Sequence, residues 1–355
     1  MSSILVVTDA WHPQVNGVVR SLKQLSNALK QQDVTLKFLT PLEFRNMSMP
    51  TYPEIQLSIA VPHDIRRFIE AANCEHLHIA TEGPLGWMAR SAALREGRVF
   101  TTSYHTRFPE YVRARAPIPT NWCYSLMKWF HNSGDGCMVA TSSLEQELDE
   151  RGFDNLMRWS RGVDHKQFRP VKSDVFAGLP RPIFLNVGRV AVEKNVEAFL
   201  DLELPGSKVV VGDGPQLEAL KEAYPHVVFT GPKSGEALTQ AYAAADVFVF
   251  PSLTDTFGNV LLEALACGTP IAAFPVTGPL DIVGETRAGV LSQNLEEAAL
   301  KALSIPPDHC REMAQRFSWE ASAEQFMSNV HAAYNIGCNP TDKHLADGGG
   351  RLTIN

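Results

Sequence analysis

Short apolar runs alternate with longer amphipathic stretches along most of the 355-residue chain. Apolar runs without a polar face are typical of strands buried on both sides of a parallel sheet, and amphipathic stretches between them are typical of crossover helices. The first half contains the runs Ile4–Thr8, Val34–Leu39, Leu77–Ala80, Val99–Tyr104 and Gly136–Ala140. The second half contains Pro182–Val187, Lys208–Val211, Val227–Thr230, Val247–Phe250 and Pro270–Ala273. The pattern predicts an α/β fold with one Rossmann-type domain in each half.

A polar connector that contains Gly162 and Pro170 separates the two series of runs. Glycine and proline interrupt regular elements, and domain boundaries fall in such segments. We therefore expect a first domain at 1–165 and a second at 166–317. A helical pattern at about 318–336 begins with a serine cap and can pack back onto the first domain. Residues 340–355 are expected to form a flexible tail.

Composition narrows the class of protein. Hydrophobic residues make up 45% of the chain and charged residues 20%, which is typical of a globular protein. Residues 3–8 have no basic flank and predict a buried strand, not a signal peptide. The longest apolar stretch, Ala241–Phe250, is too short to span a bilayer. The six cysteines form no Cys-x-x-Cys pair, which favours a reducing cytoplasm over a disulfide framework or a zinc site.

The formal net charge of −7 is unevenly divided. Residues 1–170 hold 19 Lys and Arg against 17 Asp and Glu, whereas the remainder holds 13 against 22. An acidic total argues against nucleic-acid binding. The mildly basic first half can lie against an anionic membrane surface.

Ligands bind beyond the carboxyl ends of the strands in open α/β sheets, so the loops after the strands carry the candidate chemistry. Gly17 begins a helix after the first strand, where backbone N–H groups and the helix dipole favour a phosphate. A turn glycine without a ligand is the alternative. Arg189 and Lys194 follow the first strand of the second half and can converge on a diphosphate. Two solvated cations would give the same pattern.

Two acids and a histidine occupy later loops. Asp255 lies in a loop and Glu263 eight residues further on, roughly 12 Å away at the rise of a helix, which suits a sugar at one end and a ribose at the other. Glu263 lies among apolar residues, where a carboxylate needs a partner. Surface acids are the alternative. His105 follows an apolar strand and can hydrogen-bond a transferring sugar, although a structural histidine fits equally well.

Several motifs together resemble the family 4 retaining glycosyltransferases of GT-B fold, from Asp9 to about Tyr334. The motifs are Val211-Gly212-Asp213-Gly214-Pro215, Gly188-Arg189 with Lys194-Asn195, the pair Asp255 and Glu263, Ser160-Arg161-Gly162-Val163-Asp164 with Phe168-Arg169-Pro170, and Phe317-Ser318-Trp319-Glu320. Within the family, three motifs are similar to the branch of sulfoquinovosyl-diacylglycerol synthases and bacterial α-mannosyl- and glucuronosyltransferases of glycolipids. They are Trp11-His12-Pro13 with Asn16-Gly17-Val18, Ser103-Tyr104-His105-Thr106 with Phe108-Pro109 and Tyr111, and Thr254-Asp255-Thr256-Phe257-Gly258.

The resemblance implies two Rossmann-type domains whose parallel sheets face each other across a cleft. It places Gly17 at the donor phosphate, Arg189 and Lys194 on the diphosphate, Asp255 at the donor sugar, Glu263 on the ribose and His105 in the active site. The implied catalytic residues are His105, Asp255, Lys194 and Arg189. The implied donor-binding residues are Gly17, Arg189, Lys194, Gly212, Lys233, Asp255, Phe257, Gly258, Asn259 and Glu263. Asp255 departs from the wider family, which mostly has Glu there.

The implied reaction moves a hexose or hexuronic acid from a nucleoside diphosphate sugar, with a UDP-sugar favoured, to a lipid such as diacylglycerol or a glycolipid. A front-face transfer is favoured because no nucleophilic carboxylate stands out near His105. No Asp-x-Asp loop or His/Asp cluster is evident, so neither a metal nor a cofactor is expected. The alternatives are a GDP-mannose-dependent α-mannosyltransferase, transfer to a soluble or polysaccharide acceptor, a sugar-nucleotide epimerase and a non-catalytic binding protein.

Residues 107–131 bear on the acceptor. This segment interleaves the cations Arg107, Arg113, Arg115 and Lys128 with the aromatic residues Phe108, Tyr111, Trp122, Tyr124, Trp129 and Phe130. Such a mixture suits the interfacial zone of a membrane, although a packed helix on the acceptor side would also fit. We expect a lipid acceptor and peripheral attachment to the inner face of the cell membrane. The donor base, the sugar and the oligomeric state stay open.

Overall fold

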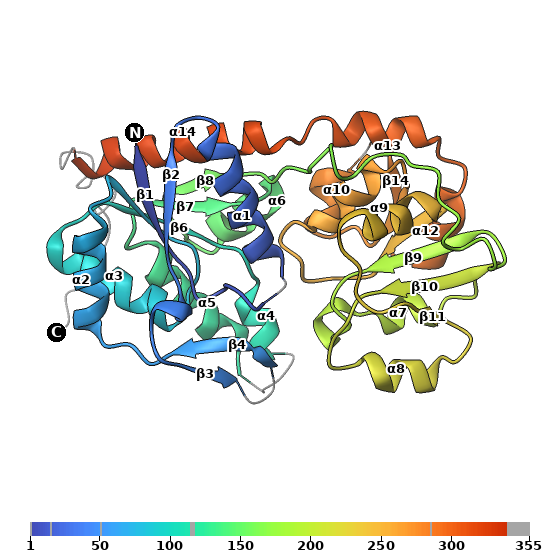
Figure 1. Cartoon of the computed structure of the whole chain (residues 1–355), viewed down its shortest axis with the longest axis horizontal. Coiled ribbons are helices and arrows are strands. Elements are labelled where there is room, and N and C mark those ends of the chain that lie inside the picture. Colours follow the sequence, from blue (N-terminus) through green and yellow to red (C-terminus); the bar gives the residue numbers. More distant parts are fainter. Residues whose placement is uncertain (1, 15, 50–51, 114–117, 285, 339–355) are drawn as a thin grey trace, which may run out of the picture.

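The computed structural model describes the whole chain except residues 1, 15, 50–51, 114–117, 285 and 339–355. The predicted tail at 340–355 therefore lies outside the described residues. Two parallel sheets, each flanked by helices, lie side by side (Figure 1). The predicted α/β architecture with one sheet in each half is confirmed.

The first sheet has six strands in the order β2-β1-β5-β6-β7-β8, all paired in parallel. Its strands are β1 (Ser3–Val7), β2 (Thr35–Leu39), β5 (His76–Ile79), β6 (Phe100–Ser103), β7 (Gly136–Val139) and β8 (Leu156–Arg158). Its helices are α1 (Gly17–Lys30), α2 (Pro62–Ala72), α3 (Pro84–Glu96), α4 (Phe108–Arg113), α5 (Thr120–His131) and α6 (Ser142–Glu150). The short helix η1 (Pro41–Glu43) and an antiparallel hairpin follow β2; the hairpin comprises β3 (Asn46–Met49) and β4 (Tyr52–Ser58).

The second sheet has the order β11-β10-β9-β12-β13-β14, again with every pairing parallel. Its strands are β9 (Ile183–Val187), β10 (Ser207–Val211), β11 (Val228–Phe229), β12 (Val247–Phe250), β13 (Ile271–Ala273) and β14 (Gly289–Leu291). Its helices are η2 (Val192–Lys194), α7 (Glu197–Leu200), α8 (Leu217–Ala223), α9 (Gly235–Ala244), α10 (Asn259–Ala266), α11 (Pro279–Ile282), α12 (Leu295–Ala302) and α13 (Pro307–Ala314). Every residue of the central strands β9 and β12 is buried, because helices cover both faces of the sheet.

The last helix, α14 (Trp319–Cys338), carries the chain from the second sheet back onto the first (Figure 1). Trp319, Phe326 and Val330 pack in one apolar cluster with Ile4 of β1 and Leu25 of α1. Full burial of a side chain such as Phe326 contributes about 1.5–3 kcal/mol. The helix therefore fastens the two halves together. We propose that the boundary between the two domains lies between residues 165 and 166.

The strand order of each sheet reverses at its first strand, so that β1 lies between β2 and β5, and β9 lies between β10 and β12. Loops that leave neighbouring strands in opposite directions open a crevice at such a switch point. Arg189 and Lys194 follow β9, and Asp255 follows β12. The strand order thus brings two loops that are about 60 residues apart in sequence to the same edge of the second sheet.

Three features were not predicted: β8, β14 and the hairpin of β3 and β4. The strands β8 and β14 have three residues each, lie at sheet edges and are only partly buried or exposed. Short edge strands carry a weak apolar signal because one side faces solvent. Their pairing with β7 and β13 defines them as strands.

Candidate active site

Lys194 and Asp255 form a close ion pair at the switch point of the second sheet. Lys194 Nζ lies 2.5 Å from Asp255 Oδ1. Burial disfavours the charged ammonium, but the neighbouring Asp255 carboxylate more than offsets this effect and raises the pKa of Lys194. The second carboxylate oxygen, Asp255 Oδ2, is buried and has no hydrogen-bond partner among the described residues. The pair therefore holds both a fixed cation and an unused acceptor at the edge of the sheet.

Arg189 lies near the same pair on the loop after β9. Its guanidinium is 3.7 Å from the carboxylate of Glu193, which is buried. Tyr111 of α4 approaches this cluster from the first domain: burial raises the pKa of its phenol, and the charges of Lys194 and Asp255 act on it. Glu193 and Tyr111 were not predicted as site residues. The cluster is thus lined from both domains.

Glu263 is buried on α10 and has two partners. Tyr242 donates its hydroxyl proton to Oε2 over 2.9 Å, and Arg20 of α1 lies 3.5 Å from Oε1. Burial raises the pKa of Glu263, while Arg20 and Tyr242 act in the opposite direction. The partner that a carboxylate among apolar residues requires is therefore supplied within the protein. Arg20, one helical turn after Gly17, reaches Glu263 across the cleft.

The N-termini of α1 and α10 meet across the cleft. Asn16 caps α1 by accepting a hydrogen bond from Val19 N over 3.0 Å, and Gly17 follows as the first helical residue. A Cβ on Gly17 would lie 3.8 Å from Asn259 Nδ2, and Asn259 donates to Ser21 Oγ over 3.2 Å. Neither helix has an acidic residue in its first turn. Two positive dipole ends therefore face one region, an arrangement that favours an anion.

His105 lies directly beyond β6, close to the loop that carries Asp255. Its backbone carbonyl accepts a hydrogen bond from Thr256 Oγ1 over 2.7 Å. Its Nδ1 lies 3.0 Å from a guanidinium nitrogen of Arg161, and its Nε2 is buried without a hydrogen-bond partner within the described part of the chain. Burial and the charge of Arg161 hold the pKa of His105 well below its usual range. The imidazole is therefore neutral at physiological pH.

Three predicted donor-binding residues have evident structural roles. A Cβ on Gly212 would lie 1.8 Å from Gly188 O, so only glycine allows the loops after β9 and β10 to pack together. Gly258 adopts a φ of 88° as it begins α10, a conformation that favours glycine. The ring of Phe257 is buried and contacts Phe317 edge-on. Any contact of Phe257 with a donor would therefore involve its backbone.

Lys233 lies in the loop after β11, at the far edge of the second sheet. No hydrogen bond or ion pair joins it to the cluster around Lys194 in the part of the chain that the structure describes. A metal site is likewise not evident: no group of three or more His, Cys, Asp or Glu side chains among the described residues could hold an ion. The donor-binding role of Lys233 therefore stays a prediction, and so does the expectation that the donor site needs no metal.

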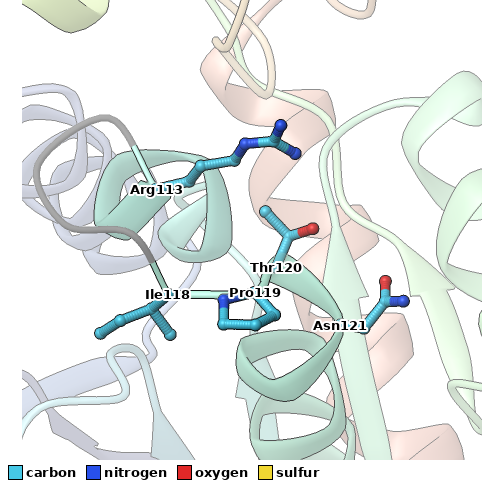
Figure 2. Close-up of a pocket in the computed structure, with 5 residues that line it drawn as sticks. All are labelled: Arg113, Ile118, Pro119, Thr120 and Asn121. Carbon is cyan, nitrogen blue, oxygen red and sulfur yellow. The ribbon is translucent and has the colours of Figure 1, made fainter.

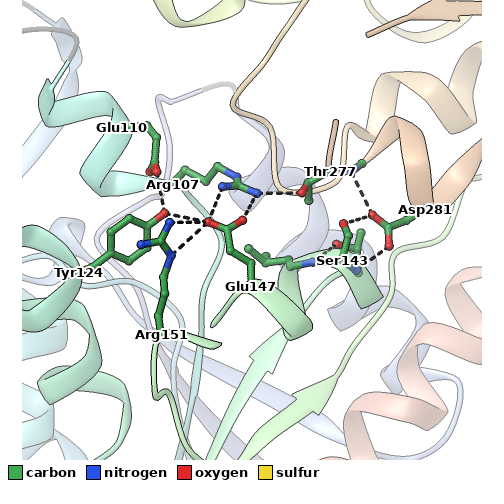
Figure 3. A network of polar contacts seen from close by, with 11 residues as sticks. Arg107, Glu110, Tyr124, Ser143, Glu147, Arg151, Thr277 and Asp281 are labelled. Carbon is green, nitrogen blue, oxygen red and sulfur yellow. Dashed lines mark hydrogen bonds and ion pairs between the residues drawn. The ribbon is translucent and has the colours of Figure 1, made fainter. Parts of the chain in front are cut away.

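Polar side chains join the two domains directly (Figure 3). Arg107, which follows β6, donates to Thr277 Oγ1 over 2.8 Å and pairs with Glu147 of α6 at 2.6 Å. Asp281 of α11 accepts hydrogen bonds from Ser142 Oγ and from the backbone N–H of Ser143, both over 2.9 Å. We call this arrangement, in which polar side chains of the two domains are in direct contact, the closed form.

The segment 107–131 divides into buried and exposed faces. Tyr124 and Phe130 are buried and the side chain of Arg107 is only 11% exposed, so their predicted place on a membrane-facing surface was wrong. Arg107 binds Glu147, and the rings of Tyr124 and Phe130 fill the core between α5 and the sheet. Trp122 and Trp129 are 74% and 59% exposed, and their place on a membrane-facing surface stays a prediction. Arg115 lies outside the described residues.

A pocket of about 390 Å³ opens beside this segment (Figure 2). It is lined by Arg113, Ile118, Pro119, Thr120 and Asn121. None of these residues belongs to the predicted donor-binding set.

None of the described helices has the length and apolar character needed to cross a membrane.

Some of the site residues that the sequence did not reveal had a detectable signal. Arg161 lies in the motif Ser160-Arg161-Gly162, which was noted as part of the connector and of the family resemblance but not as a source of site residues. Arg20 follows Gly17 by three residues, so it shares a helix face with the glycine. Tyr242 and Glu193 had no signal in the sequence. Their roles depend on burial and on the partners that the fold supplies, which are Glu263 for Tyr242 and Arg189 for Glu193.

Two Rossmann-type domains joined across a charged cleft at the carboxyl ends of their strands define the GT-B class of glycosyltransferases. Two solved structures share the fold. Sucrose-phosphate synthase from Thermosynechococcus elongatus has a TM-score of 0.75 at 22% identity, covering 94% of this chain and 100% of that one. HepE from Anabaena, in complex with UDP and glucose, has a TM-score of 0.71 at 15% identity with the same coverage.

The sequence comparisons identify the family. The "Glycosyltransferase Family 4" model matches residues 15–167, and "Glycosyl transferases group 1" matches 181–305. The GDP-mannose-dependent alpha-mannosyltransferase of Corynebacterium glutamicum is 30% identical over 81% of this chain and 76% of that protein. The chain belongs to glycosyltransferase family 4, and the protein is a glycosyltransferase.

Two further relatives are also named as glycosyl-transferring enzymes, and the name of the second includes a diacylglycerol lipid. The sulfoquinovosyl transferase of Arabidopsis thaliana is 28% identical over 81% of this chain, which spans 62% of that protein. The alpha-monoglucosyldiacylglycerol synthase of Streptococcus pneumoniae is 27% identical over 92% of this chain and 84% of that protein.

Proposed function

We propose that this protein transfers a hexose or hexuronic acid from a nucleoside diphosphate sugar, with a UDP-sugar favoured, to a lipid acceptor with retention of anomeric configuration. The observation that carries the proposal is the meeting of the α1 and α10 N-termini beside Arg20, Arg189 and Lys194. Fixed dipoles and cations around one region stabilise the charge that develops on a departing diphosphate. Residues on both domains contribute, so closure of the cleft completes the site.

The donor roles proposed for individual residues follow from this placement. Gly17 and Asn259 lie where the two helices meet, and Lys194 and Arg189 line the loop after β9. Asp255 Oδ2 offers a buried acceptor for a sugar hydroxyl. Glu263 can accept from the ribose hydroxyls once the weak contact with Arg20, at 3.5 Å, is given up. His105 can donate from Nε2 to an oxygen of the sugar.

Retention through a front-face transfer is supported by the state of Asp255. Its loop contacts His105 through Thr256, so it is the carboxylate to consider as a nucleophile. Its Oδ1 is held by Lys194 at 2.5 Å, which lowers its nucleophilicity. A direct test is Asp255→Gly with added azide. A glycosyl azide with the anomeric configuration inverted relative to the donor would indicate a covalent intermediate on Asp255. We expect that this product does not form.

The lipid acceptor is supported by the outer face of α5. Trp122, Leu126 and Trp129 recur at helical spacing and are all exposed. The chain from Tyr111 to Gly134 contains no Asp or Glu, although it contains Arg113 and Lys128. Exposed tryptophans beside cations suit the interface of an anionic membrane. The same segment begins with Tyr111, next to the active-site charges, so a lipid at this surface would be close to the cleft.

A panel experiment tests the proposal. The purified protein is incubated with UDP- and GDP-sugars and with detergent-dispersed diacylglycerol or glycolipids, and products are identified by mass spectrometry and NMR. An α-linked glycolipid made from a UDP-sugar is expected. Release of sugar or nucleotide without any glycosylated lipid would refute the lipid acceptor, and an interconverted nucleotide sugar would indicate an epimerase.

A GDP-mannose-dependent α-mannosyltransferase is the second candidate. It is supported by the 30% identity with the Corynebacterium glutamicum enzyme that bears this name. The same panel separates the two donors, because a GDP-mannose-specific enzyme would leave every UDP-sugar intact. Transfer to a soluble or polysaccharide acceptor would appear when those acceptors replace the lipids.

A further inference from the structure

Arg161 is a buried cation in the connector between the two domains, and the donor roles proposed above do not include its side chain. It is 4% exposed, and no carboxylate pairs with it among the described residues. Burial lowers the pKa of its guanidinium to about 9. A buried charge is costly unless other groups stabilise it. The surroundings of Arg161 should therefore show what its placement achieves.

The guanidinium is held in a fixed orientation from three directions. One terminal nitrogen donates to Trp159 O over 2.7 Å and to Ser160 O over 3.3 Å. The guanidinium carbon lies 4.0 Å from the centre of the Trp159 ring, in a cation–π contact. The other terminal nitrogen, Nη2, lies 3.0 Å from Nδ1 of His105. Arg161 thus spans from the connector to the active-site histidine.

The chemistry of this last contact fixes the tautomer of His105. Arginine has donors but no acceptor, so its bond to Nδ1 requires a lone pair on that nitrogen. The ring proton of the neutral imidazole must then reside on Nε2. Nε2 is buried and meets no acceptor within the described residues. A buried donor without a partner is destabilising, and a bound hydrogen-bond acceptor would remove that cost.

The other charged or titratable groups around His105 agree with a neutral ring. Burial has the largest effect, and Arg161, His78 and His131 also lower the pKa of His105. His78 uses both ring nitrogens, bonding Thr101 Oγ1 at 2.8 Å and Ser103 Oγ at 3.0 Å. His131 is bound to Glu82 at 3.0 Å. Arg161 is therefore the one of these groups that bonds His105 directly.

The connector residues that contact the Arg161 guanidinium are held in place by α14. Trp159 donates its indole N–H to Ser322 Oγ over 3.1 Å, and Ser322 Oγ donates to Ser160 O over 2.8 Å. A Cβ on Gly162 would lie 2.4 Å from the backbone at Ser318, so the connector packs tightly against the start of α14. The motif Ser160-Arg161-Gly162 is therefore a tightly packed segment that fixes the position of the Arg161 side chain.

We propose that Arg161 is a positioning residue that holds His105 as a neutral donor, with its Nε2–H directed at an oxygen of the transferred sugar. Arg161 itself does not touch the substrate. The claim that Nε2–H binds a sugar oxygen rests on the proposed function. The claim that Arg161 sets the tautomer of His105 does not, so the tautomer and the proposed function can fail separately.

The tautomer is tested by ¹⁵N NMR of [¹⁵N]histidine-labelled full-length protein, with His105 assigned by its loss in His105→Gln. The wild type should show a proton on Nε2 alone at pH 7. Arg161→Met removes the donor to Nδ1 while keeping a long side chain, and should give a mixture of tautomers. Arg161→Lys retains a donor and should restore the Nε2–H form. A wild-type spectrum for Arg161→Met would overturn the proposal.

Turnover provides the second readout, measured with the donor and acceptor found by the panel. Arg161→Met should lower kcat roughly 10- to 100-fold, as expected for loss of one oriented hydrogen bond in the transition state, with KM for the donor nearly unchanged. In a His105→Ala background the same change should cost less than about twofold, because the two residues act as one unit. Independent effects in the double variant would show that Arg161 acts through something other than His105.

Ser322→Ala is the matched control for packing. It loosens Trp159 but leaves the guanidinium bonded to His105, so the tautomer should stay on Nε2. If Arg161→Met fails to fold, Arg161→Lys alone decides: a mixed tautomer in that folded variant contradicts the proposal, and Nε2–H supports it. If no donor is turned over by the wild type, the proposed function fails, while the NMR result still judges the role of Arg161.

Discussion

At the scale of single residues, the site is built from opposite charges that neutralise each other in the absence of a ligand. Lys194 pairs with Asp255, and Arg20 pairs with Glu263. An incoming diphosphate would compete with Asp255 for the ammonium, and a ribose would compete with Arg20 for Glu263. Each charged side chain would then be paired both before and after the ligand binds, so that no buried charge is left uncompensated.

Lys194→Ala tests the importance of the cation for turnover. We expect kcat to fall by roughly 100-fold or more, because the ammonium would no longer stabilise the departing diphosphate. Circular dichroism and thermal unfolding should show that the fold survives. Lys221→Ala is the control, since Lys221 is exposed on α8 and pairs with Glu218 on the same helix. Turnover like that of the wild type would remove Lys194 from the diphosphate site.

Stability should decrease at mildly acidic pH because of His78. Burial lowers the pKa of His78 to about 3, so it stays neutral in the folded chain but takes up a proton in the unfolded chain below about pH 6.5. Lowering the pH from 7 to 5 therefore favours unfolding, by at most about 2 kcal/mol from this residue. His78→Gln should flatten the pH dependence of the unfolding free energy, measured by urea titration.

An exposed histidine provides the comparison for that titration. His226→Gln, at an exposed site in the second domain, should keep the wild-type dependence. Equal slopes for wild type and His78→Gln between pH 5 and 7 would contradict a neutral His78.

At the scale of elements, α5 has two apolar faces. Its inner face packs Tyr124, Met127 and Phe130 against the first sheet, while Trp122 and Leu126 lie on the opposite, exposed face. A helix that is apolar on its solvent side marks an interaction surface. α5 packs against α4, the helix that contributes Tyr111 to the cleft.

Trp122→Ser combined with Leu126→Ser tests this surface. Binding to vesicles with 30 mol% anionic lipid should weaken by roughly tenfold or more, since two exposed apolar side chains no longer enter the interface. Co-sedimentation at low salt measures the effect. Leu300→Ser on α12 with Leu303→Ser just after its end is the matched control, because those leucines are exposed in the other domain. A wild type that ignores anionic vesicles would refute membrane attachment.

At the scale of the whole molecule, the contact between Asp281 and α6 favours the closed form (Figure 3). The carboxylate accepts from Ser142 and Ser143 at the N-terminus of α6, where the helix dipole favours a negative charge. Burial raises the pKa of Asp281, but the hydrogen bonds outweigh it, so the net shift is downward. Asp281 is therefore charged at neutral pH and binds across the domain boundary.

Asp281→Ala should shift the protein toward open forms. Small-angle scattering is expected to show a larger radius of gyration without ligand, and KM for the donor should rise about 3- to 10-fold because closure costs more free energy. A saturating nucleotide sugar should restore the compact form. Asp308→Ala, which removes a pair within α13, should change neither quantity. An unchanged radius and KM in Asp281→Ala would exclude a role for this contact in closure.

The sequence by itself determined the two sheets and the loops that carry the candidate chemistry. Runs such as Ile4–Thr8 and Val247–Phe250 are buried on both faces, and a continuous apolar stretch encodes that burial locally. The loops after them are equally local, so Gly17, His105, Lys194 and Asp255 could be named in advance. The short edge strands β8 and β14 escaped prediction because they bury too little apolar surface.

Only the tertiary structure decided which residues meet. Arg161 bonds His105 and Arg20 reaches Glu263 because strand order, the path of α14 and the closed cleft bring together segments 56 and 243 residues apart. The same holds for exposure: Trp122 and Phe130 are both aromatic residues of α5, yet one faces solvent and the other the core. Local patterns cannot encode such pairings, because they depend on how whole elements pack against each other.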